Sequence, residues 1–153
     1  MNTLAMKLTS GCLDLMQTDA QADNLPVGCH LVSPRGFYLH HGIYLGGGEV
    51  IHYSGFSGSF RAGPVEVVGL EQFANGRSIW IVQEAREYSD DEVVSRARSR
   101  VGESRYSVFS NNCEHFCNWC ISGKSCSAQI RALFHYPRYW LSLVSALHLS
   151  FIA

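Results

Sequence analysis

The sequence predicts an α+β fold in which a mainly antiparallel sheet packs against helices. Runs of β-branched and aromatic residues fill the first half of the chain, glycine-rich turns separate them, and helical patterns dominate the second half. Strands followed by helices, rather than alternating with them, are typical of this class. The 153 residues correspond to one domain, which at this length buries a core without needing disulfide bonds.

Turn residues and strand-forming residue types locate the strands. Glycines 46–48 predict a hairpin turn, because glycine adopts the positive φ that tight turns require. Pro34 and Gly36 predict another turn upstream. The expected strands are residues 28–32, 37–45, 49–53, 65–68 and 78–82.

Capping residues locate the helices. Ser89, with Glu92 three positions later, forms a capping box that starts one helix. Gly123 and Pro137 are stop signals for two later helices. The other helical segments expected are residues 113–121 and 127–135, a short turn over 70–73 and, only loosely, residues 1–20.

The net charge argues against a nucleic-acid partner, and the cysteine pattern argues against disulfide bonds and a structural zinc site. The net charge of −1 provides no basic surface for a nucleic acid. Cysteines stand at positions 12, 29, 113, 117, 120 and 126, but we expect a reducing compartment and free thiols. The last four lack the second, well-separated ligand pair of a structural zinc site, so we expect neither metal nor cofactor. Cys117 and Cys120 are expected to be small buried residues on a helix face.

Cys113 stands where a chain entering a helix exposes a thiol. Asn111 or Asn112 serves as N-cap, so the cysteine falls in the first turn, near unpaired N–H groups and the positive end of the helix dipole. That position lowers a thiol pKa, and we expect alkylation by iodoacetamide to stay fast down to about pH 6. A poised thiol with separate histidines is typical of covalent acyl chemistry.

Two motifs, in this order, resemble the lecithin:retinol acyltransferase-like domain family. The first runs from Pro34-Arg35-Gly36 through His40-His41-Gly42-Ile43-Tyr44-Leu45-Gly46 to Val50-Ile51-His52-Tyr53-Ser54-Gly55, and the second is Asn111-Asn112-Cys113-Glu114-His115-Phe116. The family includes the H-Ras-like-suppressor phospholipases and acyltransferases, and it is a circularly permuted relative of NlpC-type papain-like peptidases. The resemblance covers roughly residues 26–133 and implies a circularly permuted papain-like core.

The resemblance implies Cys113 as nucleophile, His40 as general base and His52 as the residue that orients His40. His41 competes for the role of base, but neighbouring side chains on a strand face opposite sides, so only one of the two faces Cys113. We favour His40, because His52 follows it by twelve positions as in the family.

The expected hairpin does not by itself bring His52 to His40. A regular turn pairs His52 with Ile43, three positions from His40, which places the two histidines about 10 Å apart. A bulge near Gly42 or a strong twist is needed to join the rings.

The resemblance implies a thiol-dependent acyltransferase or phospholipase-type hydrolase that forms an acyl-thioester on Cys113. Its expected partner is a lipid or another acyl-bearing substrate. Two alternatives stay open: an NlpC-type amidase or peptidase, and a catalytically idle binding or effector module with the same fold.

The catalytic domain is expected over residues 26–136, between an N-terminal extension (1–25) and an apolar tail (137–153). Met1 to Leu15 lacks a secretory signal, so a cytoplasmic location is expected. The apolar stretch over 139–153 is shorter than the ~20 residues that a membrane helix needs. Packing on the domain, contact with a membrane interface and a truncated span all stay open for it.

Overall fold

The computed structural model describes residues 7–10, 13–18, 24–36, 38–55 and 62–135, together with the single positions 138 and 145. The apolar tail predicted over residues 137–153 lies outside the described residues except at those two positions. None of the described helices combines the length and the apolar character that a membrane crossing requires.

In the part of the chain that the structure describes, seven strands form one open sheet in the order β1-β2-β7-β3-β4-β5-β6. Every neighbouring pair in it is antiparallel. The α+β prediction with a mainly antiparallel sheet is confirmed. The strands are β1 (Lys7–Ser10), β2 (Leu13–Thr18), β3 (His30–Arg35), β4 (Tyr38–Gly46), β5 (Glu49–Gly55), β6 (Gly63–Gly69) and β7 (Ile79–Gln83).

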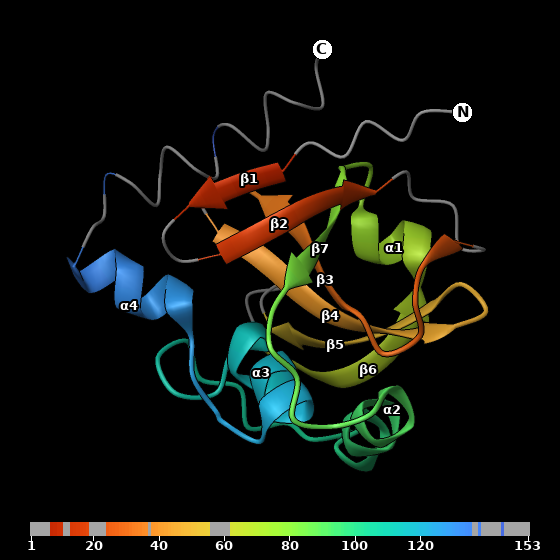
Figure 1. Ribbon diagram of the computed structural model, residues 1–153. Helices are drawn as coiled ribbons and strands as arrows, with labels where there is room; N and C mark the ends of the chain where they lie inside the picture. Colours follow the sequence, from red (N-terminus) through yellow and green to blue (C-terminus); the bar gives the residue numbers. More distant parts are fainter. Residues whose placement is uncertain are drawn as a thin grey trace.

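Four helices with described bounds cover the two faces of this sheet. They are α1 (Leu70–Ala74), α2 (Asp90–Ser99), α3 (Cys113–Ser122) and α4 (Ala128–His135). Helix α1 contacts β5 and β6, while α2 and α3 lie together against β4 on the other side (Figure 1). Helix α4 packs separately, with Ala132 against buried residues of β2, β3, β4 and β7.

The expectation of a loose helix over residues 1–20 is wrong, because β1 and β2 occupy this segment. Strand β2 pairs with β7 from Asp14–Gln83 to Thr18–Ile79. Leu15 is fully buried between partly exposed neighbours, which is the alternation of a strand. The free edge of β7 supplies backbone partners that outweigh the weak helical pattern. Strand β3 also runs to Arg35, past the turn expected at Pro34.

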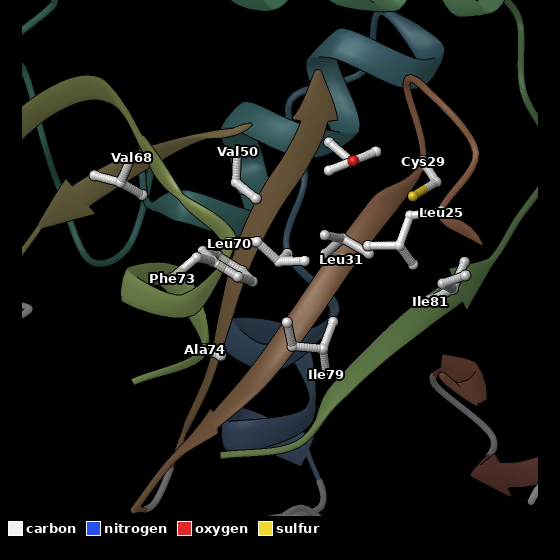
Figure 2. Packing of buried hydrophobic residues seen from close by; sticks show 11 residues of the cluster. Leu25, Cys29, Leu31, Val50, Val68, Leu70, Phe73, Ala74, Ile79 and Ile81 are labelled. Atoms are coloured by element: carbon white, nitrogen blue, oxygen red, sulfur yellow. The ribbon is translucent and has the colours of Figure 1, made fainter. Parts of the chain in front are cut away.

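The alternation of β4 divides the core between two faces. Tyr44 packs with Leu31 and Phe73 on the α1 face, where Figure 2 shows the side chains of this cluster. Its neighbour Ile43 packs with Phe116 on the α3 face. Each face of β4 therefore presents its own side chains to a different layer of helices.

The predicted capping box at the start of α2 is confirmed, and an arginine on that helix fixes α3. Ser89 N–H donates to the Glu92 carboxylate at 2.9 Å, and Glu92 N–H donates to Ser89 Oγ at 3.4 Å. The Arg96 guanidinium lies 4.0 Å from the centre of the Trp119 ring and donates to the Trp119 carbonyl at 2.9 Å. Stacking together with hydrogen bonding holds the two helices against one another.

Candidate active site

Helix α3 begins at Cys113 because Asn112 caps it. The Asn112 side-chain oxygen accepts from the backbone N–H groups of Glu114 and His115, each at 3.0 Å. His115 Nδ1 accepts in return from the Asn112 N–H at 3.3 Å, which completes a capping box. Cys113 is therefore the first residue of the helix. Of the two asparagines that the sequence left open, Asn112 is the cap.

Asn111 holds the approach to the helix instead. Its side-chain nitrogen donates to Glu103 at 3.0 Å and to the Arg105 carbonyl at 2.9 Å. Its side-chain oxygen accepts from Arg100 at 3.1 Å. These bonds tie the loop before α3 to the end of α2, so the cysteine enters the site from a restrained segment.

Glu114 joins the start of α3 to the start of α4, a role that the sequence did not reveal. Its carboxylate is buried and accepts from the hydroxyl of Ser127, from the Ala128 N–H at 2.9 Å and from the Gln129 N–H at 3.0 Å. A carboxylate at these free N–H groups stabilises the first turn of α4. The residue beside the candidate nucleophile thus positions a helix that lines the site.

Cys113 and His40 line the same cavity, which has a volume of about 450 Å³. Pairing between β4 and β5 ends at Gly42–His52, while β5 stays paired with β6 as far as Gly55–Gly63. The cavity lies beyond that end, between β4, β5, the start of α3 and one side of α4. Its lining residues are Tyr38, Leu39, His40, Ser54, Tyr106, Val108, Asn112, Cys113, Gln129, Ile130 and Leu133.

The structure joins His40 to His52, with the Nε2 atom of His40 2.6 Å from the Nδ1 atom of His52. A bulge between Tyr44 and Gly46 makes this possible, because it shifts the pairing so that His52 lies opposite Gly42. A shift of one residue turns a side chain to the other face of a sheet. The sequence-based pairing with Ile43 is therefore wrong. Of the two departures from regular pairing that the sequence left open, a bulge or a strong twist, a bulge is present three residues beyond Gly42.

Gly42 and Phe73 hold the two imidazoles in place. The Phe73 ring centre lies 5.4 Å from that of His40 and 6.0 Å from that of His52. A Cβ atom at Gly42 would come within 2.8 Å of the Phe73 ring and 2.6 Å of the Val50 side chain. Glycine at this position therefore allows Phe73 to pack closely against both rings.

His41 faces away from this pair, which confirms the alternation that the sequence predicted. Its Nδ1 atom lies 2.7 Å from His30 Nε2, and its Nε2 atom lies 2.7 Å from Gln129 Nε2. Gln129 also donates to the Leu39 carbonyl and accepts from the Leu39 N–H. The sequence missed His30 and Gln129. For Gln129, the available signal was its spacing: it stands three positions before Ala132, which puts both on one face of the expected helix. The structure shows that this face is buried.

The lowered thiol pKa expected from the sequence is wrong for this structure. Burial raises the pKa of Cys113 to about 12, although the N–H groups of His41, Glu114 and Cys113 itself act in the opposite direction. Burial, followed by the charges of His52 and Arg35, holds the pKa of His40 well below its ordinary value. In the resting site, a neutral thiol and a neutral imidazole therefore line the same cavity. Within the described residues, no hydrogen bond joins this sulfur to His40.

The other cysteines form no metal site in the part of the chain that the structure describes. The five cysteines described there carry free thiols. No group of three or more His, Cys, Asp or Glu side chains among the described residues is arranged to hold a metal ion. Cys117 and Cys120 are fully buried in the α3 core, as the sequence predicted.

Comparison with known proteins agrees with the two motifs. The family model described as lecithin retinol acyltransferase matches residues 23–126. The chain is 29% identical to lecithin retinol acyltransferase of Bos taurus over 126 residues, which cover 63% of this chain and 54% of that protein. It is 25% identical to that of Mus musculus over 128 residues, or 65% and 55% of the two chains. The chain thus spans about half the length of the curated relatives it matches. Because the family model covers more than half of its residues, this chain belongs to the lecithin retinol acyltransferase family.

Proposed function

We propose that this chain is an enzyme that transfers or hydrolyses lipid acyl groups through Cys113. One observation carries the proposal: Cys113, at the start of α3, and His40, from β4, line one cavity, and His40 is hydrogen-bonded to His52. A thiol, a base and a residue that orients the base are the components of covalent acyl transfer. Both curated relatives are named lecithin retinol acyltransferases, which supports a reaction of this kind.

The first half of the reaction forms an acyl-thioester. The Cys113 sulfur bonds to the acyl carbonyl carbon while His40 takes the thiol proton, so the neutral pair needs no thiolate before substrate arrives. Negative charge develops on the carbonyl oxygen, and the backbone N–H of Cys113, which the Asn112 cap does not use, is available to stabilise it. The bond to the leaving alcohol then breaks, and His40 returns the proton to that oxygen.

The second half releases the acyl group and restores the thiol. Water or an acceptor hydroxyl or amine attacks the thioester carbon and gives its proton to His40. The carbon–sulfur bond breaks, and the departing sulfur takes that proton back. Water makes the reaction a hydrolysis, whereas an acceptor alcohol or amine makes it a transfer.

The shape of the site supports a lipid substrate. Apolar side chains dominate the cavity lining, as in sites that bury apolar ligands. At its rim, Val108 and Leu133 are 43% and 48% exposed. Phe109 and Phe134 stand beside them with ring centres 6.3 Å apart, and they are still more exposed. An acyl chain entering here would meet apolar surface outside the cavity as well as inside it.

The test is the mass of the intact protein after incubation with mixed phospholipids. We expect the wild-type chain to gain the mass of one acyl group, mapped to Cys113, and Cys113→Ala to gain none. Cys113→Ser, which keeps the size of the side chain, is the matched control for folding. An adduct of equal yield in Cys113→Ala would refute the assignment.

One observation favours the idle module as a second candidate. A fully protonated thiol is a poor nucleophile unless a base removes its proton, and burial raises the pKa of Cys113. An idle module forms no adduct with phospholipids or with short activated esters, whereas an amidase forms one with peptide or isopeptide amides and with short activated esters but not with phospholipids. The same mass measurement therefore separates the three functions.

The boundaries of the catalytic domain and its cellular place are proposals too. The family match over residues 23–126 supports a catalytic domain near 26–136, to whose sheet β1 and β2 of the N-terminal segment are joined through β7. The circularly permuted papain-like core, the cytoplasmic location and membrane contact through the tail stay predictions. Binding of the full chain and of a chain ending at residue 136 to lipid vesicles would test the tail.

A further inference from the structure

One nitrogen of the histidine pair is buried without a hydrogen-bond partner. His52 Nε2 is shielded from solvent, and it makes no hydrogen bond among the described residues. A carboxylate oxygen of Glu66 lies 3.4 Å away, within ion-pair distance but without hydrogen-bond geometry. A buried ring nitrogen without a partner is costly, so this position calls for one.

Strand pairing brings Glu66 to this nitrogen. His52 and Glu66 stand directly opposite each other in the β5–β6 ladder, so their side chains share one face of the sheet. The Glu66 side chain is 45% exposed, and that of His52 is 7% exposed. Closure of the 3.4 Å gap therefore needs only a small movement of a half-exposed side chain.

The direction of hydrogen bonding along the pair depends on what lies at this end. An ionised carboxylate can only accept, so a bond to Glu66 requires the proton of His52 on Nε2. His52 Nδ1 then carries a lone pair and accepts from His40 Nε2–H across the 2.6 Å contact. His40 Nδ1 is left unprotonated, which is the form that a base for the thiol needs.

Without an acceptor at this end, the same pair can run the other way. His52 Nδ1–H then donates to His40 Nε2, and the proton of His40 moves to Nδ1. In that tautomer His40 has no free lone pair for the Cys113 thiol. A base held in the wrong tautomer is inactive even when its position is correct.

We propose that Glu66 is a positioning residue that sets the tautomers of His52 and His40. The inference rests on the proposed function, because it assigns His40 the task of taking the thiol proton. Glu66 is not one of the described residues that line the cavity, so the route from Glu66 to the thiol runs through His52. It acts as a hydrogen-bond acceptor rather than as a charge.

Nitrogen-15 NMR of the ring nitrogens tests the tautomers without any substrate. Protonated and unprotonated imidazole nitrogens have well-separated shifts, and His40→Gln and His52→Gln assign the two rings. We expect both rings of the wild-type full chain to carry their proton on Nε2. Glu66→Met, of similar length but without an acceptor, is expected to populate the Nδ1–H form of His40. Glu66→Gln, which keeps an acceptor oxygen, is expected to retain the wild-type pattern.

Acylation by a short activated ester, followed by intact mass, tests the consequence. We expect Glu66→Met to lose about tenfold or more in kcat with little change in KM, since general base catalysis is weakened and binding is not. Glu66→Gln is expected to recover most of that loss. The control is Glu49→Met, the same change at an exposed glutamate on β5.

The outcomes separate this inference from the proposed function. Unchanged ring shifts and rate in Glu66→Met would overturn the inference and leave the nucleophile intact. Equal losses in Glu66→Gln and Glu66→Met would overturn the acceptor role, because the lost charge would then be the cause. If the wild-type chain forms no adduct at all, the proposed function fails, while the NMR result still decides what Glu66 does.

Discussion

Two histidine pairs start from neighbouring residues of β4 and lie on its opposite faces, one joined to β5 and the other to β3, and their hydrogen bonds end differently. On one face, His40 is bound to His52, and the ring of His40 reaches the cavity that Cys113 lines. On the other, His41 is bound to His30. Both pairs are buried, and both lie near a glutamate. His40 lines the cavity of about 450 Å³ that holds Cys113, whereas His30 lines a separate and smaller cavity of about 190 Å³.

In the second pair, the outer ring nitrogens of both histidines are hydrogen-bonded to other side chains of the protein. His30 Nδ1 lies 2.6 Å from the Glu84 carboxylate, which accepts a hydrogen bond from its N–H. His41 Nδ1–H then donates to His30 Nε2, and the Gln129 amide donates to His41 Nε2. All four ring nitrogens are used within the protein, so this pair has no lone pair left for chemistry. A buried histidine is a candidate base only where one nitrogen faces a cavity.

The largest expected effect is the loss of acylation in His40→Gln. We expect the rate of adduct formation on Cys113 to fall by about 10²–10⁴, the usual contribution of a general base. His41→Gln, one position away, is expected to keep most of the rate. Stopped reactions with a short activated ester, analysed by intact mass, measure both. Equal losses in two folded variants would contradict the division between the pairs.

The rate of alkylation of Cys113 reports how much of the thiol is ionised in the cavity that His40 lines. Because burial raises the pKa of Cys113 to about 12, the thiolate fraction stays small below that pH. We expect the rate of alkylation by iodoacetamide to rise about tenfold per unit from pH 7 to pH 10 without a plateau. Peptide mapping after timed labelling assigns the site, and Cys113→Ala gives the background. A plateau by pH 8 would show that the free thiol is activated after all.

Acid is expected to destabilise the fold through both pairs. Burial holds the pKa of His40 and His41 well below 6.5, and that of His52 at about 4. Below pH 6.5 the unfolded chain binds protons that the folded chain does not, so stability falls as pH falls. Relative to pH 7, each of these three rings lowers the free energy of unfolding by about 2 kcal/mol at pH 5, and together they lower it by several kcal/mol.

Urea unfolding at pH 7 and pH 5 measures this loss. Glu103 does not interfere, because the Arg100 guanidinium lowers its pKa to about 2 and its contribution is lost only below about pH 4.5. Equal unfolding free energies at the two pH values would contradict neutral buried rings. His41→Leu should show a shallower pH dependence, since one proton-binding site of the unfolded chain is gone.

The smallest expected effect is that of His41→Leu on stability at pH 7. The variant leaves the Nε2 atom of His30 without its donor and the Gln129 amide without one acceptor, so we expect a loss of about 2–4 kcal/mol. Thermal unfolding measures it, with Val94→Leu on the half-buried face of α2 as a control. A loss under about 0.5 kcal/mol would show that the hydrogen bonds from Glu84 through His30 and His41 to Gln129 add little to stability.

The sequence predicted local structure best where local chemistry decides it. Ser89 and Glu92 form the expected capping box, Gly123 ends α3, and strand alternation separates His40 from His41. It failed over residues 1–20, where pairing with β7 overrides a weak helical pattern. Glu114 and Gln129 escaped notice because their partners are distant in the sequence or belong to the backbone.

By itself, the sequence determined the family, the α+β class and the choice of Cys113, His40 and His52 as candidates. Their motifs and spacings are local, and they can be read without knowing how the chain folds. Only the tertiary structure decided that His52 reaches His40, because the bulge before Gly46 sets which face it occupies. It also decided that the Cys113 thiol is protonated, since the cost of burial depends on every atom packed around the sulfur.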